Sequence, residues 1–228
     1  MTFRGVAAID GPSGSGKSSV SKAVAKALGL RYMDTGAMYR AVAYGAHSAG
    51  IDLEDAAAVQ RFAEQMDLPV PTDPDRQQIL VNGQDVTAQI RTSEVSHIVS
   101  SVATNLGVRA ELVRRQQAVV ADGEAIVLEG RDTTTVIAPQ ADVRILITAD
   151  PQARIARRAA ELHRTVDADT MSRTTAQILE RDAKDATVVE FHTAADGVVT
   201  LDTSHLSFEG SVDAVLQIIA DTNRKQDL

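Results

Sequence analysis

Short apolar runs alternate with helical patterns along most of the chain. The strand-like runs cover residues 5–10, 31–33, 127–129, 143–147 and 197–201. Residues 17–28 carry Val20, Val24 and Leu28 on one helical face, and Gly29 is a typical helix end. Strands that alternate with helices pair in parallel and carry helices on both faces. The pattern therefore predicts an α/β fold, in which an open parallel sheet of about five strands lies between two helical layers.

The stretch between about residues 67 and 86 departs from this alternation. It contains Asn82-Gly83 between two short apolar runs, which is a strong signal for a two-residue hairpin turn. We expect three short antiparallel strands here, which would form an insertion that stands off the main sheet. The predicted division is a core of residues 1–62 and 98–228 with an inserted unit of residues 63–97.

A second departure is a helix from Pro151 to about residue 164, followed by a polar link and another helix through Ala183. Pro151 suits a first helical turn with Asp150 as its cap. Three arginines at spacings i, i+3 and i+4 share one face of this helix. They are Arg154, Arg157 and Arg158.

Composition and charge narrow the range of functions. The chain has 23 Lys and Arg against 31 Asp and Glu, and its net charge of −8 argues against sequence-independent binding of nucleic acid polymers. It has no cysteine, which rules out disulfides, thiolate metal sites and cysteine nucleophiles. No apolar run approaches the ~18 residues of a membrane span, and no separate signal-peptide core precedes the first strand. We therefore expect a cytoplasmic protein without a membrane partner.

A complete phosphate-binding motif follows the first strand. Residues 11–18 read GPSGSGKS, which matches G-x-x-x-x-G-K-[ST], and the strand before it and helix after it are the context that the motif requires. Lys17 is suited to the β- and γ-phosphates of ATP, and the Ser18 hydroxyl to Mg²⁺. A chance Gly/Ser loop is the alternative, and it explains this context poorly. The predicted ATP-binding residues are Gly11, Pro12, Ser13, Gly14, Ser15, Gly16, Lys17, Ser18 and Ser19.

This motif alone does not identify a reaction. The D-x-x-G and N-K-x-D strings of GTPases are both absent, so we exclude that class. A kinase for a small acceptor needs arginines around a second anionic group and a lid that excludes water. Three alternatives remain at this point: a nucleotide kinase, a kinase for a metabolite such as shikimate, and a regulatory module that binds ATP but turns over poorly.

Further motifs carry a family resemblance over nearly the whole chain. They are IDGPSGSGKSSVS (9–21), DTGAMYRA (34–41), IRTSEVS…SSVA (90–103), VRAELVRRQ (108–116), EGRD (129–132) and ERDAKD (180–185). Together they resemble bacterial cytidylate kinases, within the nucleoside monophosphate kinases. The resemblance implies a P-loop three-layer fold, transfer of a phosphoryl group from ATP to CMP or dCMP, and a monomer. It also implies that the insertion is the monophosphate-binding domain and that a helical lid covers about residues 151–183.

The resemblance assigns the cytosine edge to three side chains. Asp132 and Ser100 resemble the partners of the N4 amine, and Arg109 resembles the donor to N3 and O2. Uracil places a carbonyl where cytosine has its amine, so a fixed carboxylate would reject UMP. Asp132 is a poor candidate for a purely structural carboxylate, because an unpaired buried charge is costly.

The resemblance assigns the phosphates mainly to arginines. Arg40 and Arg131 resemble the clamp on the acceptor phosphate, where Thr35 also donates, while Arg181 is placed near the phosphates and Asp185 near the ribose. Arg154, Arg157 and Arg158 resemble the lid arginines, although an arginine on a helix is often only a solvated surface charge. The predicted catalytic residues are Lys17, Arg131, Asp132, Arg154 and Arg158, and the predicted metal ligand is Ser18.

Two positions depart from the family pattern. Thr134 stands where the family usually has a glycine, and Thr restricts the backbone if φ is positive there. Val188 stands where the family usually has a further arginine. Three hypotheses follow for the missing ligand: His192 replaces it, a lid arginine replaces it, or Arg40 and Arg131 alone hold the acceptor phosphate.

Overall fold

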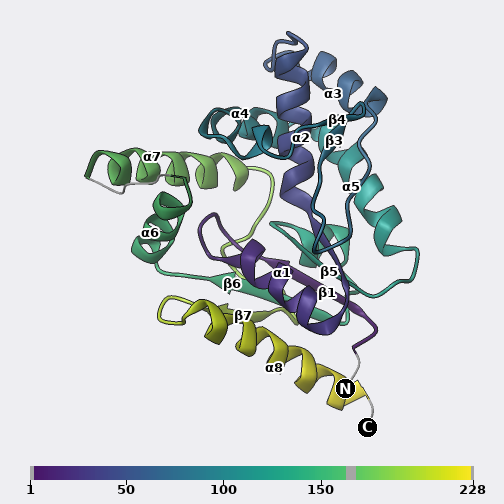
Figure 1. Cartoon of the computed structure of the whole chain (residues 1–228), viewed down its shortest axis with the longest axis vertical. Coiled ribbons are helices and arrows are strands. Elements are labelled where there is room, and N and C mark those ends of the chain that lie inside the picture. Colours follow the sequence, from purple (N-terminus) through teal and green to yellow (C-terminus); the bar gives the residue numbers. More distant parts are fainter. Residues whose placement is uncertain (1–2, 163–167, 227–228) are drawn as a thin grey trace.

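The computed structural model describes residues 3–162 and 168–226, and its elements follow the order drawn in Figure 1. The strands are β1 (Val6–Asp10), β2 (Arg31–Asp34), β3 (Leu80–Val81), β4 (Gln84–Asp85), β5 (Ile126–Gly130), β6 (Val143–Thr148) and β7 (Val199–Asp202). The helices are α1 (Lys17–Leu28), α2 (Thr35–Ser48), α3 (Ala56–Gln65), α4 (Ser93–Ala103), α5 (Leu106–Val120), α6 (Pro151–Leu162), α7 (Ala168–Asp185) and α8 (Phe208–Gln226). Two short turns complete the order, the 3₁₀ turn η1 (Gln89–Arg91) and the π turn η2 (Thr133–Ile137).

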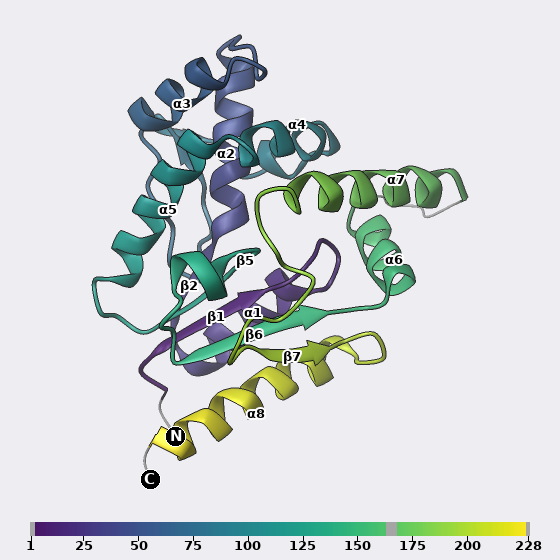
Figure 2. The same ribbon diagram turned by 180° about the vertical axis from the view of Figure 1, so that it is seen from behind.

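The main sheet has five strands in the order β2-β5-β1-β6-β7, and all neighbours are parallel. Side chains alternate between the two faces of β1. Ala7 and Ile9 pack with α1 and α8 on one face, while Ala8 packs on the other face with residues of η2 and the end of α5. Both views of the ribbon show this layering (Figures 1 and 2). The predicted α/β class, the strand count and the three-layer arrangement are confirmed.

The predicted hairpin is present, but the predicted third strand is not. Asn82 (φ 50°) and Gly83 (φ 80°) form the turn between β3 and β4, which are the only strands in residues 67–86. The segment before them contains Pro69, Pro71 and Pro74, which lack the N–H groups that a sheet ladder needs. This segment runs beside β2 instead, where the Tyr32 N–H donates to the Thr72 carbonyl at 2.8 Å.

The hairpin packs into a hydrophobic cluster that lies beyond the main sheet. Its side chains Ile79, Val81 and Val86 contact residues of α2, α3, α4 and α5. Figure 2 shows these helices together on one side of the sheet's carboxyl ends. The boundaries 63–97 for an inserted domain stay a prediction, and the cluster extends well beyond them on both sides.

Helices α6 and α7 pack against each other and project past the ends of the strands (Figures 1 and 2). The expected end of the first of these helices near residue 164 lies outside the described residues. The Arg158 Nη2 of α6 donates to the Ser96 Oγ of α4 at 3.2 Å, which ties this pair to the cluster of helices opposite. In the described part of the chain, no helix is long and apolar enough to span a membrane.

Asp10, the last residue of β1, anchors the loop that follows β5. Its two carboxylate oxygens accept bonds from the N–H and hydroxyl groups of Thr133 and Thr134, at 2.6 to 2.8 Å. Among the described residues, Asn82 alone has a positive φ without being glycine, so the backbone at Thr134 is unstrained. The threonine that departs from the family pattern is therefore accommodated, and its hydroxyl satisfies a buried carboxylate.

We expect a Thr134→Gly variant to lower the free energy of unfolding by about 2 kcal/mol, because it removes one hydrogen bond to a buried charge and loosens the backbone. Urea unfolding followed by circular dichroism measures this. Thr135→Gly is the matched control, since Thr135 is exposed and does not bond to Asp10. Equal losses in the two variants would show that only backbone entropy is involved.

Candidate active site

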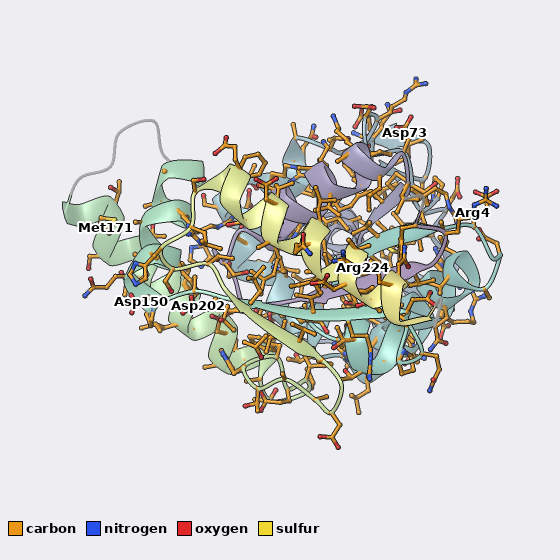
Figure 3. All side chains as sticks on the ribbon, turned by 90° about the horizontal axis from the view of Figure 1, so that it is seen from below. Arg4, Asp73, Asp150, Met171, Asp202 and Arg224 are labelled. Atoms are coloured by element: carbon orange, nitrogen blue, oxygen red, sulfur yellow. The ribbon has the colours of Figure 1, made fainter. Side chains whose placement is uncertain are left out.

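The candidate site residues gather at the carboxyl ends of the strands, where ligands bind in open α/β sheets. The loop at 11–16 follows β1, Asp34 ends β2, and Glu129 and Asp132 lie at and just after the end of β5. β6 and β7 end side by side at the same edge, where the Asp150 N–H donates to Ser204, close to Asp202 (Figure 3). Parallel pairing thus brings together residues that are far apart in the sequence, such as Ala7 and Val143.

The loop after β1 has the geometry of a phosphate cradle. Gly14 (φ 76°) and Gly16 (φ 87°) have backbone angles that favour glycine, and Gly16 caps the N-terminus of α1. A Cβ at Gly11 would lie 2.3 Å from the Ile147 carbonyl oxygen, so this position must also be glycine. The Ser15 hydroxyl is buried and has no hydrogen-bond partner among the described residues. Converging N–H groups, a helix N-terminus and an unsatisfied hydroxyl all fit an anion.

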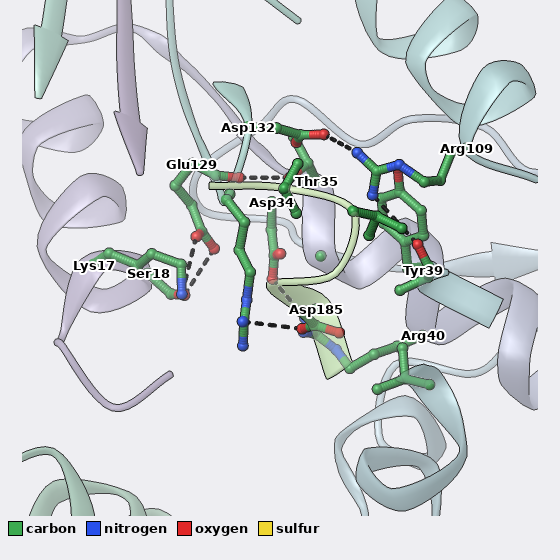
Figure 4. Close-up of a pocket in the computed structure, with 17 residues that line it drawn as sticks. Lys17, Ser18, Asp34, Thr35, Tyr39, Arg40, Arg109, Glu129, Asp132 and Asp185 are labelled. Carbon is green, nitrogen blue, oxygen red and sulfur yellow. Dashed lines mark hydrogen bonds and ion pairs between the residues drawn. The ribbon is translucent and has the colours of Figure 1, made fainter. Parts of the chain in front are cut away.

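Lys17 and Ser18 meet at Glu129, a carboxylate to which the sequence analysis gave no role. The Ser18 hydroxyl donates to Glu129 Oε1 at 2.7 Å, and Lys17 Nζ lies 3.9 Å from Oε2 (Figure 4). Burial and the nearby charge of Asp34 raise the pKa of Glu129 from 4.5 to about 7, although Lys17 and Ser18 oppose the shift. Lys17 and Ser18, which we predicted to bind the phosphates of ATP and Mg²⁺, therefore both contact a buried carboxyl group in this structure.

Asp34 links β2 to α2 and positions Arg40. It caps α2 by accepting from the Ala37 N–H at 2.8 Å, and it pairs with Arg40 at 2.9 Å. Burial acts to raise the pKa of Asp34, but the charges of Arg40 and Arg91 outweigh it and hold the pKa below its usual value. Thr35, predicted to donate to a phosphate, donates to the Glu129 carbonyl at 2.9 Å and lines the same pocket as Arg40.

The side chains predicted for the base lie at the other end of this pocket. Asp132 and Arg109 form a short buried ion pair, which we call the base-end pair (Figure 4). Burial raises the pKa of Asp132, and Arg109 counteracts part of that shift. Ser100 does not join them: its hydroxyl donates to Asp185 at 3.4 Å. The Tyr39 ring, which the sequence analysis missed, lies 5.8 Å from the Arg109 guanidinium carbon, and its hydroxyl is buried without a partner among the described residues.

Arg131 and Arg154 are joined by one carboxylate that the sequence analysis also missed. Asp182 Oδ1 lies 2.9 Å from Arg131 Nη2, and its Oδ2 lies 2.7 Å from Arg154 Nη1. Asp185 pairs with the other arm of Arg131 at 3.0 Å, and the Phe191 ring lies 4.3 Å from its guanidinium carbon. Asp182 thus links Arg154, the first predicted lid arginine, to Arg131, a predicted clamp arginine.

The remaining predicted arginines are placed differently from one another. Arg158 faces the cavity beside the phosphate loop. Arg157 points to the other side of that loop, where it donates to the Thr203 carbonyl at 2.6 Å and to the Ser15 carbonyl at 3.3 Å. Arg181 lies in α7, and its side chain is outside the described residues. His192 is exposed and its ring packs against Phe191, so it lines neither cavity at this site.

Two cavities meet at this edge of the sheet. The first leads to the base-end pair and the second to the phosphate loop, where Ser13, Gly14, Gly16 and Ser19 line it. Five residues line both cavities: Lys17, Ser18, Asp34, Arg40 and Arg131. Arg91, which follows the hairpin in η1 and was missed, adds a further cation to the second cavity.

The second cavity gathers five cations, although the whole chain is acidic. Lys17, Arg40, Arg91, Arg131 and Arg158 all line the second cavity. Such a group of cations suits two phosphate-bearing molecules that meet between the cavities. Donors aimed at one small volume also stabilise charge that develops during transfer.

Comparison with known proteins identifies close relatives along the whole chain. A family model described as cytidylate kinase matches residues 7–221. A cytidylate kinase of Cutibacterium acnes is 44% identical over 220 residues, which cover 96% of this chain and 97% of that protein. A cytidylate kinase of Nocardia farcinica is 42% identical over 217 residues, with coverage of 94% and 93%. One of Streptomyces avermitilis is 44% identical over 216 residues, with coverage of 94% and 92%.

Solved structures give the same fold at much lower identity. A gluconokinase from Sinorhizobium meliloti 1021 matches with a TM-score of 0.52 and 16% identity, covering 99% of this chain and 97% of that chain. At that identity the match supports the fold alone.

Proposed function

This chain belongs to the cytidylate kinase family, and from that premise we propose that it transfers the γ-phosphoryl group of ATP to CMP or dCMP, giving ADP and CDP or dCDP. The observation that carries the proposal is the pair of adjoining cavities. One cavity ends at the phosphate loop. The other ends at the base-end pair, whose carboxylate and guanidinium suit the polar edge of a cytosine base. Their shared cations lie where a donor and an acceptor phosphate would meet.

The donor end uses the phosphate loop. The backbone N–H groups of residues 11–16 and the N-terminus of α1 would hold the phosphates of ATP, with the buried Ser15 hydroxyl among them. Lys17 would turn from Glu129 to the β- and γ-phosphates. Mg²⁺, held through Ser18, would neutralise charge on the same phosphates.

The acceptor end uses Arg40 and Arg131, which we call the phosphate clamp. Their planar forks match the oxygens of a phosphate, and both line the boundary of the cavities. At the far end, Asp132 would accept from the cytosine N4 amine and Arg109 would donate to N3 and O2. Uracil would leave Asp132 facing a carbonyl, so UMP is expected to be a poor acceptor. Ser100 would act indirectly, through Asp185.

Transfer needs positioning and charge stabilisation rather than a covalent enzyme intermediate. The acceptor phosphate is already an anion, so we assign no general base. Arg154 and Arg158 would approach the transferring group as α6 and α7 close over the cavities, which also excludes water. We further propose a cytoplasmic monomer whose partners are ATP, CMP and dCMP. The net charge of −8 supports the absence of nucleic acid polymers from this set.

ADP release from Mg·ATP tests the proposal, with CMP, dCMP, UMP, AMP and shikimate offered separately and Lys17→Ala as the blank. Rapid release with CMP or dCMP and slow release with the others is expected. Release with shikimate alone would identify a metabolite kinase. ATP binding without ADP release for any acceptor would leave a nucleotide-binding module.

A His192→Ala variant is expected to keep the KM for CMP and dCMP within about twofold of the unmodified protein, because the His192 ring packs on Phe191 outside both cavities. Steady-state kinetics with both acceptors measures it. A rise of tenfold or more would show that His192 replaces the arginine absent at Val188.

A further inference from the structure

Arg91 is a cation of the second cavity that has no role in the function proposed above. It is the last residue of η1, between the hairpin and α4. Ile90 before it is fully buried in the hydrophobic cluster of the hairpin, and Thr92 after it caps α4 by accepting from the Val95 N–H at 3.4 Å. The backbone at Arg91 is therefore fixed on both sides, while its side chain is exposed and lines the cavity.

The Arg91 guanidinium differs from those of the other arginines that line this cavity. Arg40 and Arg131 form ion pairs with carboxylates of the chain, and Arg158 donates to the Ser96 hydroxyl. No hydrogen bond or ion pair joins the guanidinium of Arg91 to a residue that the structure describes. A guanidinium carries five N–H donors in a planar fork, which suits the oxygens of a phosphate. The donors of Arg91 are therefore available to an anion that enters the cavity.

Arg91 lies on the donor side of the site, close to the boundary between the two cavities. It lines the cavity of the phosphate loop and not the cavity of the base-end pair, whereas Asp34 lines both. Burial acts to raise the pKa of Asp34, and the charges of Arg40 and Arg91 lower it below its usual value. The charge of Arg91 thus reaches a carboxyl group at the boundary. On the proposed function, the γ-phosphate of ATP also lies there, because it is the group that passes to the acceptor.

Arg91 and Lys17 approach this boundary from different parts of the fold. Lys17 is the first residue of α1, directly after the phosphate loop, and α1 packs on the main sheet. Arg91 directly precedes the segment of α4, and α4 lies with α2 and α7 beyond the carboxyl ends of the strands (Figures 1 and 2). An anion between them would join the sheet to the hairpin and its helices.

We propose that Arg91 is a catalytic residue that binds the γ-phosphate of the donor. The proposal rests on the function proposed above and adds a residue to its donor side. During transfer, an oxygen of the acceptor phosphate forms a bond to Pγ as the bond from Pγ to the β,γ-bridging oxygen breaks, and that oxygen leaves on ADP with the electron pair. Negative charge is spread over the other oxygens of the transferred group, to which Arg91 donates.

Binding of two donor-site ligands to the intact chain tests this contact without turnover. The non-hydrolysable β,γ-imido analogue of ATP carries the terminal phosphate and ADP does not. Titration calorimetry with Mg²⁺ gives both dissociation constants. Arg91→Ala is expected to weaken binding of the ATP analogue about tenfold and binding of ADP by less than about twofold. Its kcat with CMP or dCMP is expected to fall by about tenfold or more. Arg91→Lys keeps a charge without the fork and is expected to lie between.

Arg76→Ala is the matched control for this substitution. Arg76 is an exposed arginine of the segment before the hairpin, and it lines neither cavity. The variant is expected to match the unmodified protein in both dissociation constants and in kcat. Thermal unfolding of each variant shows whether the fold is retained, which is expected because both arginines are exposed.

The outcomes separate this proposal from the proposed function. Unchanged binding of the ATP analogue by Arg91→Ala would overturn the contact and leave the kinase function intact. An equal loss for the ATP analogue and ADP would also overturn it, because Arg91 would then attract both anions without touching the γ-phosphate. If the unmodified protein phosphorylates no acceptor, the proposed function fails, and the two dissociation constants still decide whether Arg91 binds the terminal phosphate.

Discussion

An Arg131→Lys variant is expected to lose between about a hundredfold and a thousandfold in kcat/KM for the acceptor while remaining folded. Lysine keeps the positive charge, but its single ammonium group replaces the planar guanidinium, which can donate two parallel hydrogen bonds to a phosphate. Arg131 lines both cavities, so we expect its loss to affect the acceptor phosphate and the transferring group together. Removal of a single preorganised donor to developing charge has effects of this size.

The arrangement around Arg131 explains why a charge alone is insufficient. One arm pairs with Asp182 and the other with Asp185, at 2.9 and 3.0 Å, and the Phe191 ring lies against the guanidinium. These three partners fix the plane of the fork before a phosphate arrives, and an ammonium group on a flexible chain cannot satisfy them simultaneously.

Arg114→Lys is the control for this substitution, because Arg114 is an exposed residue of α5 that pairs only with Glu111 among the described residues. It is expected to retain activity within about twofold. Steady-state kinetics with varied dCMP, and thermal unfolding of each protein, give the comparison. Comparable kinetics for Arg131→Lys and the control would remove Arg131 from the clamp.

An Asp182→Asn variant is expected to lower kcat by about a hundredfold with a smaller change in acceptor KM, because misplacement of catalytic groups by about 1 Å has effects of that size. Asp182 lines neither cavity but holds Arg131 and Arg154 with its two oxygens. We therefore propose that Asp182 positions these two arginines. The variant is also expected to lose about 3 kcal/mol of unfolding free energy, since it leaves a buried arginine with one partner fewer.

Two comparisons distinguish positioning from simple destabilisation. Asp182→Glu keeps the charge and is expected to recover part of kcat. Asp213→Asn changes an exposed carboxylate on α8, away from the site, and is expected to alter neither kcat nor stability. A uniform loss of active protein, with kcat per folded molecule unchanged, would show that Asp182 serves only the fold.

The sequence predicts the main sheet well because its signals are local. Each strand is a short apolar run, and the order of strands and helices allows little besides parallel pairing. The phosphate loop is equally local, since its glycines, lysine and serine are adjacent. The error in the hairpin region has a local cause too, because the prolines at 69, 71 and 74 disfavour the third strand that was predicted.

The partners within the site could not be predicted in the same way. Glu129 lies 111 residues from Ser18, and Asp182 lies 28 residues from Arg154, so nothing in their local sequence announces the contacts. Glu129 lies in the EGRD motif and Asp182 in the ERDAKD motif. Their presence in these motifs was the only sequence signal that pointed to a role for them. Arg91 likewise lies in the recognised IRTSEVS stretch. A resemblance names stretches of chain, and only the packing shows which of their side chains face the same cavity.

Four cations of the site pair with carboxylates of the same chain, and this pairing has a consequence for binding. Arg40 has Asp34, Arg109 has Asp132, Lys17 has Glu129, and Arg131 has Asp182 and Asp185. The protein thus carries internal counterions, which allow these cations to lie together without mutual repulsion before any phosphate is present. On the proposed function, nucleotide binding would exchange one anionic partner of each cation for another, and the carboxylates would pair with the cations again when the product leaves.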